Sequence, residues 1–229
     1  MSSLSVILPL ALVLAGASPG AGDELLEEVA AYRYGQSREP LFRLSEEVRA
    51  SLADPGERGE MEARLVDFVE SDATVEAREI ACRELRLIGT ESAVPALSRL
   101  LLNPKLGDAA LFALASIPVP EATDALSAAL GASSGRLRVG LIQALAQRGV
   151  AHPAFHEIAG GDDPEAAAAA TWALGHTGDV DDARRILETA EPSLEAREAA
   201  LRIAERSGDA GEPVFRRLLD PSESAAVRV

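Results

Sequence analysis

The chain has 229 residues, of which 47% are hydrophobic but only 3% are aromatic. Alanine and leucine favour helices, whereas β-branched and aromatic residues favour sheets, so the composition predicts an all-α protein. The formal net charge of −15 argues against a nucleic-acid partner, because phosphate binding needs clustered lysine and arginine. The single cysteine excludes an intramolecular disulfide and a cysteine-based zinc site.

The N-terminus has the pattern of a secretory signal peptide, expected at residues 1–17. Residues 1–22 carry no charged side chain, and the apolar run VILPLALVL at residues 6–14 is followed by the small residues AGA. The run is too short to cross a bilayer as a helix, and no lysine or arginine precedes it. We therefore expect cleavage after Ala17, a mature chain without a transmembrane segment, and a periplasmic or secreted location.

Residues 18–74 are expected to form a helical capping region. Apolar periodicity predicts helices at Leu41–Ala53 and Met61–Glu70, separated by a turn at DPGERG. Together they are interpreted as a degenerate first repeat, because a terminal repeat must present a polar outer face. Upstream, the segment AYRYG contains both tyrosines, and we expect these rings to pack on the first helical hairpin.

An internal repeat dominates residues 75–229. A helix-breaking residue recurs at intervals of 29, 31, 29 and 30 residues, at Gly89, Pro118, Gly149, Gly178 and Gly208. The about twelve residues before each breaker have apolar side chains at i, i+3, i+4 and i+7, which predicts an amphipathic first helix. A short polar turn and a second helix follow, with a proline near the start of that helix in three units. The pattern gives five full units and, in the final AAVRV, the start of a sixth.

A single helical hairpin cannot bury both of its apolar faces, so the repeated units predict a stacked α-solenoid. The unit VEAREIACRELRLIGTESAVPALSRLL, from Val75 to Leu101, resembles a HEAT repeat of the short phycobilisome-lyase-like (PBS-lyase) subtype, an armadillo-type fold. The resemblance covers residues 75–229, and similar leaders occur on exported bacterial HEAT-repeat proteins. It implies a right-handed superhelix of antiparallel helix pairs whose second helices line a concave binding surface. Gly107 and Ala167 depart from the family pattern, which has arginine at their position.

The histidines and the cysteine are the candidate sites for metal or thiol chemistry. His152 and His156 are four residues apart, and His156-Glu157 resembles the His-Glu pairs with which iron enzymes of this repeat class hold their metal. Such enzymes use several pairs, this chain has one, and Pro153 is expected to leave His152 at a helix cap. A solvated position for His156 is therefore favoured over a metal site. Cys82 occupies a mostly apolar position of the repeat, which predicts an inert buried thiol.

Five arginines recur in the predicted second helices: Arg99, Arg184, Arg185, Arg216 and Arg217. If second helices line the concave side, these residues form a mildly basic strip suited to an acidic peptide or a carboxylate-rich partner. The alternative is charge pairing between neighbouring repeats, and this alternative is favoured. His156 joins the arginines as a candidate partner-binding residue.

Trp172 is the only tryptophan, in the stretch TWALGHTGD that closes the fourth first helix. Its equivalents in the other units are Arg83, Phe112, Gln143 and Arg202, so its position is not reliably a core position. The side chain is expected either to cover a gap left by the alanine-rich helix or to anchor a partner, as interface tryptophans do.

No known catalytic arrangement is present: there is no G-x-S-x-G turn, no phosphate-binding glycine loop and no H-E-x-x-H helix. The sequence therefore predicts a non-enzymatic scaffold, without a cofactor or metal, that binds a protein or peptide partner on its solenoid surface. One alternative is a repeat module of a larger exported enzyme or electron-transfer protein. A second is a metal-dependent enzyme or lyase-type chaperone of the same repeat class.

Overall fold

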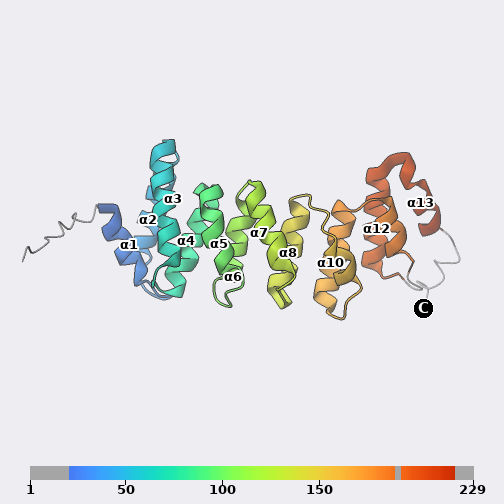
Figure 1. The fold of residues 1–229 in the computed structure, drawn as a ribbon, viewed down its shortest axis with the longest axis horizontal. Helices are drawn as coiled ribbons and strands as arrows, with labels where there is room; N and C mark the ends of the chain where they lie inside the picture. The colour runs from blue at the N-terminus through green and yellow to red at the C-terminus, as the bar shows by residue number, and fades with distance from the viewer. Residues whose placement is uncertain (1–20, 189–191, 220–229) are drawn as a thin grey trace, which may run out of the picture.

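The computed structural model describes residues 21–188 and 192–219 (Figure 1). Within these ranges the chain is helical and contains no strand, as its composition predicts. The predicted signal peptide at residues 1–17 and the start of the sixth unit at residues 225–229 lie outside the described residues. The first three helices are α1 (Ala21–Ala30), α2 (Glu39–Ser51) and α3 (Pro55–Glu70).

Five helix pairs follow, and they confirm the predicted period. The first helices are α4 (Val75–Ile88), α6 (Gly107–Ser116), α8 (Gly135–Gln147), α10 (Pro164–Thr177) and α12 (Leu194–Ser207). The second helices are α5 (Val94–Leu100), α7 (Pro120–Leu130), α9 (Ala154–Ala159), α11 (Val180–Ile186) and α13 (Glu212–Leu218). Short 3₁₀ turns at Glu91–Ala93 and Gly208–Gly211 lead into α5 and α13. Each first helix ends beside its predicted breaker.

Local sequence explains these helix ends. The Asp163 carboxylate accepts the backbone N–H groups of Glu165 and Ala166 at the start of α10, and Asp179 caps α11 in a reciprocal capping box. Gly149 and Gly208 follow α8 and α12 with φ of 74° and 56°, a left-handed conformation that glycine adopts without a Cβ clash.

The turn predicted at DPGERG is wrong in extent. Asp54 is the N-cap of α3, its carboxylate accepts the N–H groups of Gly56 and Glu57, and Pro55 occupies the first helical turn. An Asp-Pro pair is a helix-start signal, and it outweighs the two glycines that suggested a loop. The helix therefore begins six residues earlier than Met61.

Of the two tyrosine rings that were predicted to pack on the first hairpin, one is buried and the other is exposed. Tyr32 is buried in the main core, and its carbonyl oxygen accepts a hydrogen bond from the Thr74 hydroxyl. Tyr34 is exposed, stands edge-on to Tyr32, and donates from its hydroxyl to the Glu79 carboxylate on α4. These contacts tie the loop after α1 to the start of the solenoid.

The hydrophobic core consists mainly of alanine, leucine and isoleucine, and it forms two separate clusters. One cluster of buried apolar side chains runs from Leu25 to Leu174. A second, smaller cluster in the described residues joins α11 to the last helix pair: Ala183, Leu187, Ala200, Ile203, Ala204 and Val214. Ile186 is partly buried against both clusters. The break in the core therefore lies within the fourth unit, between α10 and α11.

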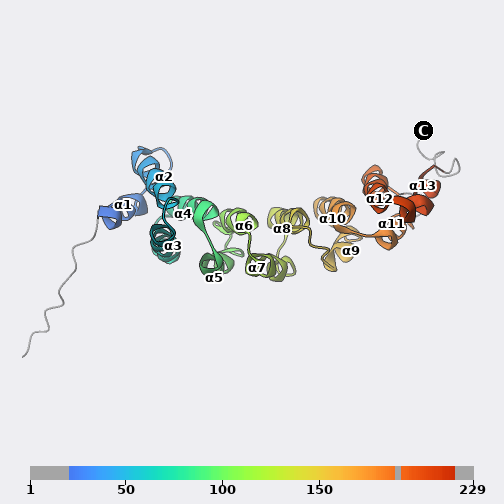
Figure 2. The ribbon, with the colours of Figure 1, turned by 90° about the horizontal axis from the view of Figure 1, so that it is seen from above.

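The first helices stack on one another more closely than the second helices do (Figures 1 and 2). A Cβ added to Gly140 on α8 would lie 2.5 Å from Leu111 Cδ2 on α6. A Cβ added to Gly175 on α10 would lie 2.9 Å from the Ala199 Cα on α12. Small residues thus let these helices approach at backbone distance, and the spacing between units is shorter on this side.

The shorter spacing makes the row bend toward the first helices, as Figure 2 shows. The expectation that the second helices line the concave side is therefore wrong for this chain. Its first helices line the concave side, and the second helices α5, α7 and α9 lie on the outer, convex side.

Candidate interaction surface

Most of the five second-helix arginines have partners within the chain. Arg99 pairs with Glu70 across neighbouring helix pairs, with its Nε 2.7 Å from Oε1. Arg184 pairs with Asp181 at 2.7 Å and Arg216 with Glu212 at 2.8 Å, each within its own helix. Arg217 donates to the carbonyl oxygen of Leu187. Charge pairing thus accounts for three of these arginines, and no basic inner strip forms.

The concave side instead presents apolar and aromatic side chains. We use the name inner face for two repeat positions of the first helices, six and two residues before the breaker, occupied by Arg83, Leu87, Phe112, Ser116, Gln143, Gln147, Trp172, His176, Arg202 and Arg206. Phe112, in the middle of α6, is 51% exposed, and Leu87, in the last turn of α4, is 42% exposed. Exposed apolar side chains that gather on one face of a protein can form a recognition surface.

The aromatic rings of the inner face are held by neighbours. The Arg86 guanidinium lies 4.8 Å from the centre of the Phe112 ring, a cation–π contact between α4 and α6. The rings of Trp172 and His176 are 4.0 Å apart, and His176 Nδ1 lies 2.9 Å from the Trp172 carbonyl oxygen. Trp172 is half-buried against the main core. It therefore packs on the core beside the alanine-rich helix and remains partly exposed to solvent.

Charge is unevenly distributed over the inner face. Two repeat positions one helical turn apart show this. They hold Phe112 and Ser116 on α6, Gln143 and Gln147 on α8, and Trp172 and His176 on α10. On α4 and α12 the same positions include Arg83 and Arg202. At these two positions the central helices offer apolar contact and amide hydrogen bonds, and the arginines lie on α4 and α12.

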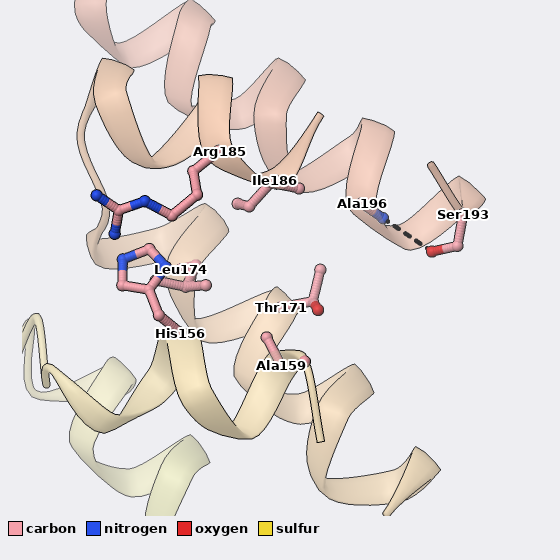
Figure 3. Close-up of a pocket in the computed structure, with 9 residues that line it drawn as sticks. His156, Ala159, Thr171, Leu174, Arg185, Ile186, Ser193 and Ala196 are labelled. Carbon is pink, nitrogen blue, oxygen red and sulfur yellow. Dashed lines mark hydrogen bonds between the residues drawn. The ribbon is translucent and has the colours of Figure 1, made fainter. Parts of the chain in front are cut away.

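A cleft opens on the outer side between α9 and α11 (Figure 3). Its volume is about 360 Å³, and α10 and α12 contribute Thr171, Leu174, Ser193 and Ala196 to its walls. His156 from α9 lies across the cleft mouth from Arg185 of α11 (Figure 3). The His156 Nε2 is 2.7 Å from Asp182 Oδ1, which links α9 to α11.

The two histidines of AHPAFHE do not form a metal pair. Helix α9 begins at Ala154, and His152 Nδ1 accepts the Ala154 backbone N–H ahead of the helix, as Pro153 predicted. Burial lowers the pKa of His152. Among the described residues no group of three or more histidine, cysteine, aspartate or glutamate side chains lies close enough to hold a metal ion.

Cys82 is fully buried in the main core, as its repeat position predicted. Desolvation raises the pKa of its thiol from 9.0 to about 12. We expect iodoacetamide to leave the native thiol unmodified at pH 8 and to alkylate it within minutes in urea, as followed by mass spectrometry. Rapid alkylation of the native protein would contradict this burial.

The raised pKa of the thiol also predicts a pH effect. The unfolded thiol ionises near pH 9 while the folded thiol stays protonated, so its stability contribution is full below pH 9 and is lost as the pH rises toward 12. The alkaline fall in unfolding free energy should be steeper in the wild type than in Cys82→Ala, by up to about 1.4 kcal/mol per pH unit. Parallel pH curves for the two proteins would contradict it.

Sequence reasoning missed a set of arginines that bridge successive first helices. Arg148, after α8, donates to the carbonyl oxygens of Ile117 at 2.9 Å and Val119 at 2.8 Å, and more weakly to Leu114 and Ala115. Arg206 does the same for Gly175 and Gly178 at the end of α10. Both arginines stand within two residues of a breaker, but at different distances from it, so the repeat alignment gives no signal for them.

Comparison with known proteins identifies the repeat. Residues 62–146, from within α3 to the end of α8, match the family model of HEAT repeats. No curated protein matches the chain. In the part of the chain that the structure describes, none of the helices combines the length and apolar character that crossing a bilayer requires.

Proposed function

The chain is a HEAT-repeat protein, and from this premise we propose that it is a non-enzymatic scaffold that binds a protein partner on its inner face. One observation carries the proposal. The row bends toward the first helices, and the exposed apolar residues Leu87 and Phe112 lie on those helices. A concave surface with aromatic anchors fits a convex protein surface or a helix.

The composition of the inner face supports an uncharged contact at its centre. Burying the exposed half of Phe112 and the free side of Trp172 removes apolar area from water, which favours association. Gln143 and Gln147 lie between the two aromatic helices and can donate and accept hydrogen bonds. The partner is therefore proposed to present an apolar stripe bordered by polar backbone or amide groups.

The site of action is proposed to be the periplasm or the cell exterior. The support is the uncharged N-terminal sequence, with its apolar run at residues 6–14 and the small residues AGA that follow. N-terminal sequencing of the protein purified from its native cells tests this point, and a mature N-terminus at Ser18 is the expected result.

Site-specific photo-crosslinking tests the inner face. A photoreactive phenylalanine analogue replaces Gln143, at the centre of the inner face, and in a control protein replaces Ser127 of α7 on the outer row. We expect irradiation of native extract to give one discrete adduct with the Gln143 protein and none with the control. Equal crosslinking from both positions would refute the assignment of the face.

Truncating the two aromatic side chains gives the quantitative test. The double variant Phe112→Ala/Trp172→Ala is expected to weaken the crosslinked partner's affinity at least about a hundredfold, because each interface anchor contributes about 2 kcal/mol. The matched control is Leu102→Ala, which removes a 53% exposed leucine beyond α5. Unchanged affinity in a double variant with native helicity would contradict the proposal.

A further inference from the structure

The cleft between α9 and α11 has a chemically asymmetric lining. Figure 3 shows Arg185 and His156 at one end, Ile186 and Leu174 in the middle, and Thr171 toward the other end. Its volume of about 360 Å³ falls in the range of small-ligand sites. The shape suits an elongated occupant with one polar end and an aliphatic body.

The cationic end of the cleft is not neutralised within the described residues. Arg184 is paired with Asp181, whereas Arg185 has no hydrogen bond or ion pair to another described residue. Asp182 is already engaged: its Oδ2 accepts the Asp179 N–H at 2.9 Å and its Oδ1 contacts His156. The chain has a net charge of −15, so its surface is not basic in general. The positive charge of Arg185 at the cleft is therefore a local feature.

The protonation pattern at the cleft follows from the same contacts. A carboxylate only accepts hydrogen bonds, so His156 Nε2 carries the proton that faces Asp182. The imidazole is thereby held in place and leaves the planar guanidinium of Arg185 as the group that can bind a carboxylate with two parallel hydrogen bonds.

The floor of the cleft is apolar. Leu174 is 4% exposed and ends the main core cluster, and Ile186 is partly buried between that cluster and the smaller one. Because the core divides at this point, an aliphatic group placed here would join the two clusters. An occupant with an aliphatic group next to an anionic group would therefore contact both the apolar floor and the cationic end.

We propose that this cleft binds an extended peptide segment of a protein partner that carries an acidic side chain next to aliphatic ones. The carboxylate pairs with Arg185, and an aliphatic side chain packs on Leu174 and Ile186. The cleft opens on the outer side of the row, so this site is separate from the inner face and does not depend on the function proposed for that face.

A capped pentapeptide, acetyl-AELLA-amide, tests the proposal against the uniformly ¹⁵N-labelled full chain by NMR titration. We expect saturable shifts of the amides of Ala159, Thr171 and Ile186, with a Kd on the order of 0.1–1 mM for so small a ligand. The glutamine peptide acetyl-AQLLA-amide should bind at least about tenfold more weakly, since it lacks the charge.

Two neighbouring arginines provide the matched variants. Arg185→Gln should weaken binding of the glutamate peptide at least about tenfold, whereas Arg184→Gln should leave it within about twofold. Trp172→Ala should also leave it unchanged, which separates this site from the inner face. Shifts confined to other residues, equal effects of the two arginine variants, or the same shifts with sodium acetate alone would each overturn the proposal.

Discussion

The variant Gly175→Val is expected to lose at least about 3 kcal/mol of unfolding free energy, the upper end of the cost of overpacking a core. The physical reason is the approach of α10 to α12. A Cβ at Gly175 would lie 2.9 Å from Ala199 Cα and 3.0 Å from its Cβ. The obstructing atoms belong to the backbone and its first side-chain carbon, so no rotamer change relieves the clash, and the helices must separate.

Urea denaturation followed by circular dichroism measures this loss. The matched control is Ala168→Val on the same helix, where the side chain is exposed and only helix propensity changes, by about 0.5 kcal/mol. Gly140→Ala offers a second comparison, because its Cβ would meet only the end of the Leu111 side chain, which can move. Equal losses for Gly175→Val and Ala168→Val would show that this helix approach is not tight.

The second large effect is expected for Arg148→Met, at about 3 kcal/mol, in the range for losing hydrogen bonds from a charged donor to buried acceptors. The guanidinium binds the terminal carbonyls of α6, and its Nε donates to the Thr123 hydroxyl at 2.7 Å. Desolvation lowers the pKa of Arg148. Methionine keeps the aliphatic stem and leaves several carbonyl oxygens without a donor.

The control for Arg148→Met is Arg136→Met on the adjoining helix α8. The Arg136 side chain is 87% exposed and lies 3.7 Å from Asp108, so its loss should change stability by less than about 0.5 kcal/mol. Arg148→Lys should fall between the two, because an ammonium group cannot reach several carbonyls in a planar fork. If Arg148→Met and Arg136→Met have the same denaturation midpoint, the carbonyl contacts do not stabilise the stack.

The repeat period and the helix boundaries were predictable because they depend on local signals. Breakers such as Gly149 and Gly208 adopt positive φ, and this requirement is visible in the sequence. The burial of Cys82 was predictable for the same reason, since aligned positions share one environment. The position of Trp172 holds both polar and apolar residues in the other units. Such a position indicates a side chain that contacts the core on one side and solvent on the other.

The direction of curvature was not predictable from the period. It depends on the difference in spacing between the two rows of helices, which is set by contacts such as Gly175 to Ala199 between units. Gly140 and Gly175 lie inside amphipathic helices, where glycine lowers the stability of an isolated helix. Their role as contact positions is visible only when the helices are stacked. The resemblance to other HEAT repeats assigned the concave side to the second helices, and this chain reverses it.

The cleft and the arginine bridges were also beyond the sequence, for a related reason. Arg148 stands one residue before its breaker and Arg206 two residues before, so alignment at the breaker does not place them together. Arg184 and Arg185 are neighbours with the same charge, yet only Arg184 is paired with an acid in its own helix. Which of these two side chains faces the cleft depends on how α11 is rotated about its own axis. The repeat pattern of the sequence does not determine that rotation.

The division of the core between α10 and α11 has a mechanical consequence. At this joint α10 and α12 pack closely through Gly175 and Ala199 on one side, and the cleft leaves the other side open. A close helix contact beside an open gap can act as a hinge: rotation about the contact changes the width of the gap while each apolar cluster stays intact. The array should therefore be stiff from α3 to α10, and α11 to α13 can move as one body when the gap is filled or emptied.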